Sequence, residues 1–206
     1  MSTASLLKFT VPLDTDDSNS TQGLLMPKLA YRFRVTFDGF GSDPGLVTEL
    51  SKQVMDFTRP TLNFNPITLD VYNSKMYLQG KPEWQPITIN IRDDVNGAVS
   101  RLVGEQIQKQ FDFAEQASAA SGIDYKFQTI IEILDGGNGA DTVNTLETWE
   151  LYGCYLTEAN YGELNYGTND PVTIALNIQY DNALQTPTGT GVGTGVTRTT
   201  NVTTTG

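Results

Sequence analysis

Apolar and polar residues alternate strictly in several segments of the chain. In residues 172–180 every second side chain is apolar: Val172, Ile174, Leu176, Ile178 and Tyr180. Residues 31–37 repeat the pattern with Tyr31, Phe33, Val35 and Phe37. A period of two residues is typical of a strand with one buried face. The pattern predicts strands at 31–37, 87–92 and 172–180, and further extended runs predict strands at 62–71, 125–134 and 148–155.

Residues 46–57 fit two patterns at once. Leu46, Leu50 and Val54 have helical spacing, but Thr48, Leu50, Lys52 and Val54 would also share one face of a strand. We favour a strand for this segment, because Pro60 and the extended run at 62–71 follow directly.

One segment has the period of an amphipathic helix. Its apolar residues recur at intervals of three and four: Val95, Val99, Leu102, Val103, Ile107 and Phe111. This spacing predicts a helix at about 95–117. Asp93 or Asp94 is expected to cap it, since a side-chain oxygen at a helix start accepts a free backbone N–H.

The expected elements are seven or eight strands and one helix, separated by turn-forming residues such as Asp38-Gly39 and the Gly-rich segment 135–141. Strands in close succession predict a mostly β (α+β) fold, an antiparallel β-sandwich or partial barrel. We expect this domain to span residues 29–184.

Both ends of the chain are expected to lie outside that domain. Residues 1–28 are interpreted as an N-terminal arm, polar and acidic at 14–23. Residues 185–206 are interpreted as a C-terminal extension, since fifteen of the 21 residues at 186–206 are Thr or Gly. Such a tail buries too little apolar surface to offset its conformational entropy. We therefore expect a neighbouring subunit to hold it.

The charge balance argues against tight nucleic-acid binding. The chain has 24 acidic and 13 basic residues, a formal net charge of −11, whereas such binding relies on Lys and Arg to neutralise phosphates. It has no His, the commonest general base and metal ligand.

The first residues lack the pattern of a secretory signal, and no segment approaches the ~18 apolar residues of a membrane helix. We expect a soluble protein that does not insert into membranes.

Six acidic residues could in principle form catalytic pairs: Asp93, Asp94, Glu147, Glu150, Glu158 and Glu163. Acid–base catalysis needs carboxylates placed across a substrate with separated pKa values. In a chain this acidic, a helix cap and solvated surface positions explain these residues better. We predict no catalytic, cofactor-binding or metal-binding residue.

Other candidate sites also have simpler explanations. Residues 136–141 match a Gly-Gly-x-Gly-x-Asp calcium repeat, but that repeat works in tandem copies and the chain has one, so we expect a hairpin loop. The Gly-rich segment 189–195 lacks the spacing of a nucleotide-binding loop. Cys154 has no His to activate it and is expected to be a buried apolar residue.

Six aromatic residues could stack on bases or sugars: Trp84, Trp149, Tyr152, Tyr155, Tyr161 and Tyr166. Basic residues are not interleaved with them, which disfavours single-stranded nucleic acid as a ligand. We expect these side chains in the core or in subunit contacts.

Three segments resemble the tail-tube proteins of contractile-tailed bacteriophages. They are residues 59–65 (RPTLNFN), 77–94 (YLQGKPEWQPITINIRDD) and 151–166 (LYGCYLTEANYGELNY), the last followed by the strand pattern that ends at 180–183. Their order and spacing match that family over residues 28–184. The N-terminal arm and the Thr/Gly-rich extension do not belong to the shared pattern.

The resemblance implies a structural protein and not an enzyme. It implies a β-sandwich or partial barrel with one flanking helix, six copies of which form a ring. Rings would stack into a tube with a continuous inner β-barrel, the conduit for genome ejection inside a contractile sheath. The implied partners are further copies of the chain, the sheath protein, and baseplate and tail-terminator proteins. The tape-measure protein and DNA would occupy the lumen without specific binding. The implied location is the virion, after assembly in the host cytoplasm.

Other functions stay open at this point. The same fold is expected in the inner tube of a tailocin, a type VI secretion system or another contractile injection system. A baseplate or tube-capping protein would form single rings. A carbohydrate-binding β-sandwich would use Trp84 and Trp149 and stay monomeric. An enzyme is least favoured, because neither His nor a nucleophile constellation is present.

Overall fold

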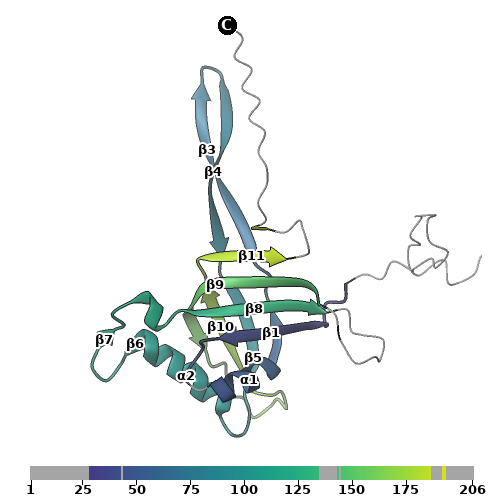
Figure 1. Ribbon diagram of the computed structural model, residues 1–206, viewed down its shortest axis with the longest axis vertical. Coiled ribbons are helices and arrows are strands. Elements are labelled where there is room, and N and C mark those ends of the chain that lie inside the picture. Colours follow the sequence, from purple (N-terminus) through teal and green to yellow (C-terminus); the bar gives the residue numbers. More distant parts are fainter. Residues whose placement is uncertain (1–27, 43, 135–142, 144, 187–191, 194–206) are drawn as a thin grey trace, which may run out of the picture.

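A computed structural model describes residues 28–42, 44–134, 143, 145–186 and 192–193, which form a curved antiparallel sheet, two α-helices and a long hairpin (Figure 1). The helices are α1 (Pro44–Lys52) and α2 (Ala98–Gln110). The strands are β1 (Phe33–Asp38), β2 (Val54–Phe57), β3 (Thr61–Val71), β4 (Ser74–Gln85), β5 (Ile87–Arg92), β6 (Phe111–Asp112), β7 (Ala117–Ser118), β8 (Phe127–Leu134), β9 (Thr145–Asn160), β10 (Thr173–Gln179) and β11 (Asn182–Thr186).

The main sheet has the strand order β1-β8-β9-β10-β5-β2, and β11 also pairs with β9. All of these pairs are antiparallel. The long strand β9 joins the two halves of the sheet, since its first part pairs with β8 and β11 and its last part with β10. Gly153 lies at this junction with φ +69, and a Cβ there would be 2.2 Å from Asp181 Oδ2. Only glycine fits that position without a shift of Asp181.

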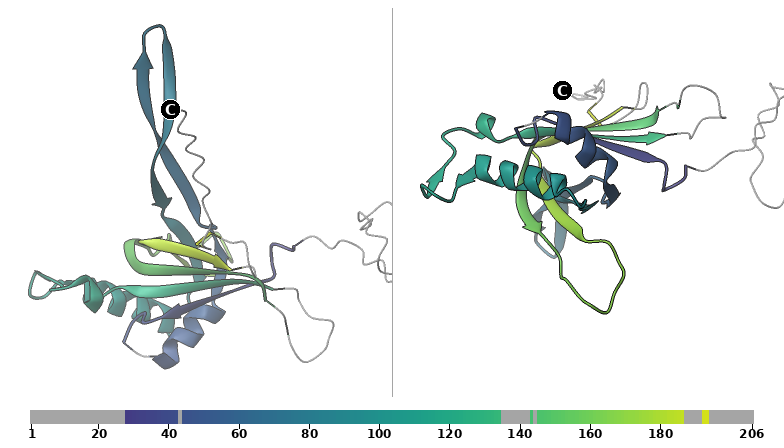
Figure 2. Two further views of the ribbon diagram at one scale, coloured as in Figure 1. Left: turned by 45° about the horizontal axis from the view of Figure 1, so that its top comes forward. Right: turned by 90° about the horizontal axis from the view of Figure 1, so that it is seen from below.

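The core fills the space between the two halves of the sheet and the helices (Figure 2). The helices contribute Leu50, Val99, Leu102 and Val103 to it, all essentially inaccessible to solvent. Strand β10 buries alternate residues, as the sequence predicted: Ile174, Leu176 and Ile178, with Tyr180 just after the strand. Val172, expected on the same face, lies before the strand and is exposed. Strand β1 likewise buries Val35 and Phe37, whereas Tyr31 lies before the strand and is exposed. The predicted mostly β, antiparallel fold is confirmed.

The strand expected over residues 46–57 is wrong for most of that range. Residues 44–52 form α1, and only Val54–Phe57 is a strand. Pro44 occupies the first helical position, where its missing N–H costs nothing. Leu50 is fully buried, and α1 packs beside α2 and β1. Tertiary packing therefore decides between two local patterns that the segment fits equally well.

The predicted helix at about 95–117 exists but is shorter, Ala98–Gln110. Gly97 has φ 66, outside the helical region, and Phe111 is extended, so the helix cannot continue at either end. Val95, expected on the apolar face, is fully exposed. The residue at the N-cap is Gly97, which has no side chain to cap the helix, but Asp94 Oδ1 accepts the Ala98 N–H at 2.8 Å, as predicted for Asp93 or Asp94.

Candidate assembly surface

The β3–β4 hairpin projects from the sheet as a long arm (Figures 1 and 2). Its strands have 11 and 12 residues, which at 3.3 Å per residue gives a length of roughly 35 Å. Within the described part of the chain, β3 and β4 pair only with each other. Tyr72 at the tip is fully exposed and has φ 49. Most of the arm is therefore accessible to another molecule.

The base of the arm is held firmly against the sheet. The Trp84 ring packs 5.7 Å from the Tyr180 ring, and Gln179 Nε2 donates a hydrogen bond to the Trp84 carbonyl at 3.2 Å. The strand register shifts between Phe64 and Pro66. Opposite this shift, a Cβ on Gly80 would lie 1.9 Å from a backbone oxygen of β3, so the close approach requires glycine.

One face of the arm is apolar. Side chains that face each other across a hairpin share a face, and the register places Ile67 opposite Leu78 and Leu69 opposite Met76. With Val71 near the tip, these side chains form the apolar face of the arm, and they are 42–52% exposed. The other face contains Thr68, Asp70, Lys75, Tyr77 and Gln79.

An exposed apolar face on a two-stranded hairpin indicates a contact surface. A hairpin alone is marginally stable in water, and contiguous exposed apolar side chains mark sites where another molecule binds. The arm has few charges that would oppose such a contact, and Asp70 and Lys75 near its tip lie only 3.9 Å apart. The apolar face of the arm is therefore the candidate assembly surface.

A buried carboxylate connects the base of the arm to two other segments. Glu147 on β9 is 3% exposed and accepts hydrogen bonds from Lys28 Nζ at 2.5 Å and from Arg59 at 2.6 Å. Trp149 Nε1 and Gln185 Nε2 donate to it at 2.6 and 2.9 Å. Arg59 precedes β3, so the cluster positions the arm. The expectation that Glu147 is a solvated surface residue is wrong.

The surroundings of Glu147 strongly favour its ionised form. Burial alone would raise its pKa, but hydrogen bonds from Lys28 and Trp149 and the charges of Arg59 and Lys28 outweigh burial and lower the pKa to about 2. The carboxylate is therefore ionised throughout the neutral range, as a structural ion needs to be and as a general acid could not be.

Replacing Glu147 with Ala is expected to lower the free energy of unfolding by about 2 kcal/mol. The buried Trp149 N–H loses its acceptor, which costs about 1–3 kcal/mol, whereas the half-exposed Lys28 and Arg59 can be rehydrated. Urea denaturation would measure the difference. Glu150→Ala, on the outward face of the same strand, serves as the control, and equal effects of both substitutions would contradict the cluster's role.

Acidic pH is expected to weaken the same cluster. A carboxylate with a lowered folded-state pKa stabilises the fold above its unfolded-state pKa, and this contribution is lost as pH falls through the folded value. We expect the difference in unfolding free energy between the native chain and Glu147→Gln to shrink between about pH 5 and about pH 2. Denaturation series at several pH values would test this, and a constant difference would refute it.

The other acidic candidates do not converge on one site. Glu150 accepts a hydrogen bond from Tyr152, Glu158 accepts one from Asn177 at 2.8 Å, and Glu163 is exposed in the loop before β10. Among the described residues, no three His, Cys, Asp or Glu side chains are grouped so that they could hold a metal ion. In that same part of the chain, no helix is long and apolar enough to cross a membrane.

Cys154 and several aromatic residues lie where the sequence indicated. Cys154 is fully buried, and burial raises the pKa of its thiol to about 11. Trp84 and Tyr155 pack in aromatic pairs. Trp149 is buried with its N–H on Glu147, so it cannot stack on a sugar together with Trp84, as the carbohydrate-binding alternative requires.

Three aromatic candidates stay on the surface, namely Tyr152, Tyr161 and Tyr166. They come from β9 and from the loop that follows it. The calcium-like segment 136–141 lies outside the described residues, as does segment 189–195 except for Val192 and Gly193.

Solved structures with the same fold come from contractile injection systems. No protein-family model and no curated protein matches the chain. A chain in the cryo-EM structure of the anti-feeding prophage baseplate superposes with a TM-score of 0.59 and 12% identity, over 79% of this chain and 97% of that one. A chain of the tube-terminating cap of the same system gives 0.54 and 13%, over 83% and 98%. A chain of the PVC sheath–tube complex gives 0.51 and 14%, over 79% and 93%.

The chain has the fold of contractile injection system components. The resemblance to tail-tube proteins, drawn from three segments of the sequence, is confirmed at the level of this fold. The match spans nearly the full length of those chains and about four fifths of this one.

The sequence analysis predicted a strand at 62–71 but not its hairpin partner β4, although a signal for β4 was present. Met76 and Leu78 alternate with Lys75 and Tyr77, which is strand patterning. Pro82 is tolerated in β4, because the free edge of a two-stranded arm requires no N–H from it. No local sequence pattern indicates that Glu147 is buried.

Proposed function

We propose that this chain is the structural subunit of the tail tube of a contractile-tailed bacteriophage. Six copies form a ring, and stacked rings form the conduit for genome ejection inside the sheath. The observation that carries the proposal is the projecting arm with its exposed apolar face, on a fold shared with contractile-system components. In the stack, this face packs against the neighbouring ring.

The charge of the chain supports a conduit for DNA. The formal net charge of −11 disfavours tight binding to phosphates. Because a lumen lined by carboxylates repels the phosphates of DNA, the tube does not retain the genome. The tape-measure protein and DNA are therefore transient occupants of the lumen, whereas the sheath, baseplate and tail-terminator proteins contact the outside and the ends of the tube.

The Thr/Gly-rich extension acts outside the ring-forming domain, residues 29–184, and is assigned to contacts with neighbouring subunits or the sheath. Its first residues, Gln185 and Thr186, still belong to β11, and Lys28 of the N-terminal arm bonds to Glu147 within the domain. The composition of the extension supports this, since it has little apolar surface with which to fold alone.

Electron microscopy of the purified chain over a concentration series tests the proposal. We expect hollow tubes of constant width that lengthen as concentration rises. Featureless monomers at every concentration, in the presence of a baseplate nucleus as well as without it, would refute a tube subunit. DNA inside tubes from purified particles would distinguish a phage from a tailocin or a secretion system, whose tubes contain no genome.

A baseplate or tube-capping protein is the second candidate. It is favoured by the superposition on chains of a baseplate and of a tube-terminating cap, with TM-scores of 0.59 and 0.54. Such a protein forms single rings that do not elongate. The same micrographs separate the two candidates, since rings that never stack in the presence of a nucleus support the cap.

A further inference from the structure

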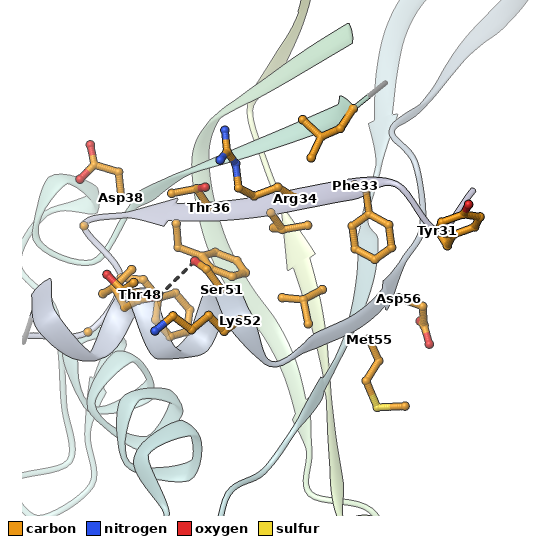
Figure 3. Close-up of a pocket in the computed structure, with 18 of the residues that line it drawn as sticks. Tyr31, Phe33, Arg34, Thr36, Asp38, Thr48, Ser51, Lys52, Met55 and Asp56 are labelled. Carbon is orange, nitrogen blue, oxygen red and sulfur yellow. Dashed lines mark hydrogen bonds between the residues drawn. The ribbon is translucent and has the colours of Figure 1, made fainter. Parts of the chain in front are cut away.

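A groove lies between β1 and β2 of the main sheet (Figure 3). Strands β1 and β2 end the strand order on opposite sides, so the curved sheet stays open between them. The groove has a volume of about 1210 Å³. β1 forms one wall, and α1 and β2 form the other. Phe33, which lines the groove, packs against Phe57 of β2 with ring centroids 5.0 Å apart.

The groove-side edge of β1 offers a row of hydrogen-bonding groups. The Leu134 N–H donates to the Arg32 carbonyl, so in this register the even-numbered residues of β1 bond to β8. Phe33, Val35 and Phe37 therefore direct their N–H and C=O groups into the groove. No backbone partner for these groups lies within the described residues. An unpaired edge of this kind is a template for another strand.

The sequence before Lys28 contains a segment with matching pattern. In residues 6–13 (LLKFTVPL), Leu7, Phe9, Val11 and Leu13 alternate with Lys8, Thr10 and Pro12. This is the period of a strand with one buried face. We propose that residues 6–13 of the same chain occupy the groove as an additional strand, antiparallel to β1.

In one register the apolar side chains of both strands share a face and opposite charges lie across from each other. With Phe9 opposite Phe37, the apolar residues of the segment join the inward face of β1. Lys8 then lies opposite Asp38, an oppositely charged cross-strand pair. Thr10 lies opposite Thr36, and both face outward, as Thr36 and Asp38 point away from the groove in Figure 3. Pro12, which has no N–H, falls where that group would point away from β1.

The connection has the required length. Residues 14–27 join the segment to Lys28 and span up to roughly 45 Å. Ala30 and Tyr31 line the groove, so the chain enters the described structure at the groove itself. The linker begins with the polar, acidic residues 14–17, which suit a solvated loop. This placement adds a strand beside β1 within the subunit and does not rest on tube assembly.

Disulfide trapping in the full chain tests the register. Thr10 and Thr36 form a pair that is not hydrogen-bonded between the strands, for which Cα atoms lie about 4.5 Å apart, within the range of a disulfide. We expect Thr10→Cys with Thr36→Cys to form an intramolecular disulfide on mild oxidation. Thr10→Cys with Arg34→Cys, two residues out of register, is the matched control. An intermolecular disulfide would assign the groove to residues 6–13 of a neighbouring subunit. The absence of any disulfide would refute the added strand. Both outcomes overturn the proposal.

Hydrogen exchange provides an independent measurement. In the native chain we expect protection of the Phe33, Val35 and Phe37 amides. Phe9→Asp is expected to raise their exchange rates about tenfold or more, while the Arg34 and Thr36 amides, bonded to β8, stay protected. Thr15→Asp, outside the added strand, is the control. Unprotected β1 edge amides in the native chain would overturn the proposal.

Discussion

The double substitution Leu69→Glu with Met76→Lys is expected to raise the concentration at which tubes form roughly a hundredfold while the subunit stays folded. The two residues face each other on the apolar face of the arm and are half exposed in the free subunit, so their replacement costs the subunit little. An opposite-charge cross-strand pair also preserves the hairpin.

In the proposed tube, the effect falls on the contact between rings. Each substitution removes a side chain worth about 1.5 kcal/mol or more when buried and introduces a charge that the contact would have to desolvate. A loss of about 3 kcal/mol per subunit corresponds to a shift of roughly a hundredfold in the concentration at which tubes form. Sedimentation and electron microscopy would measure that concentration.

The opposite face of the arm supplies the matched control. Thr68 and Tyr77 also face each other, so Thr68→Glu with Tyr77→Lys introduces the same charges on the polar face. We expect tubes from this variant near the native concentration. Equal loss of assembly in both variants would show that the apolar face has no specific role in tube assembly. Circular dichroism would confirm that both variants fold.

Leu176→Asp is expected to prevent folding altogether. Leu176 is fully buried in β10, between β5 and β9 at the centre of the sheet. An unpaired charge there costs several kcal/mol beyond the lost apolar burial, which is comparable to the total stability of a domain of this size. Ile174→Asp on the same face should behave alike. We expect aggregated chains without a cooperative unfolding transition.

Thr173→Asp is the control for the same strand. Thr173 lies on the outward face and directly opposite Arg92, so the new carboxylate meets a cation. This variant should fold and melt close to the native chain in a thermal scan. A soluble, cooperatively folded Leu176→Asp chain would contradict the inward orientation of that face.

For the arm, the sequence predicted one of the two strands, and only the structure showed where they lie. Alternation in β3 predicted an extended run correctly, but a two-residue period cannot show whether a strand pairs inside a sheet or leaves it. The structure places β3 and β4 outside the sheet, held at the base by Trp84 and by Arg59 on Glu147. The candidate assembly surface follows from this placement and not from the pattern.

The sequence predicted the strands β1, β5, β8 and β10, and for β1, β5 and β10 also the alternation of their buried face, because alternation is a local property that each strand expresses within a few residues. It also predicted α2, although over a longer range than Ala98–Gln110, and an aspartate that accepts a backbone N–H at its start, Asp93 or Asp94. Tertiary structure alone decided that residues 44–52 are helical, because α2 and β1 bury Leu50. It alone decided that Glu147 is a buried ion, since the cations that stabilise it come from 119 and 88 residues away in the chain. No local pattern encodes such a distant pairing.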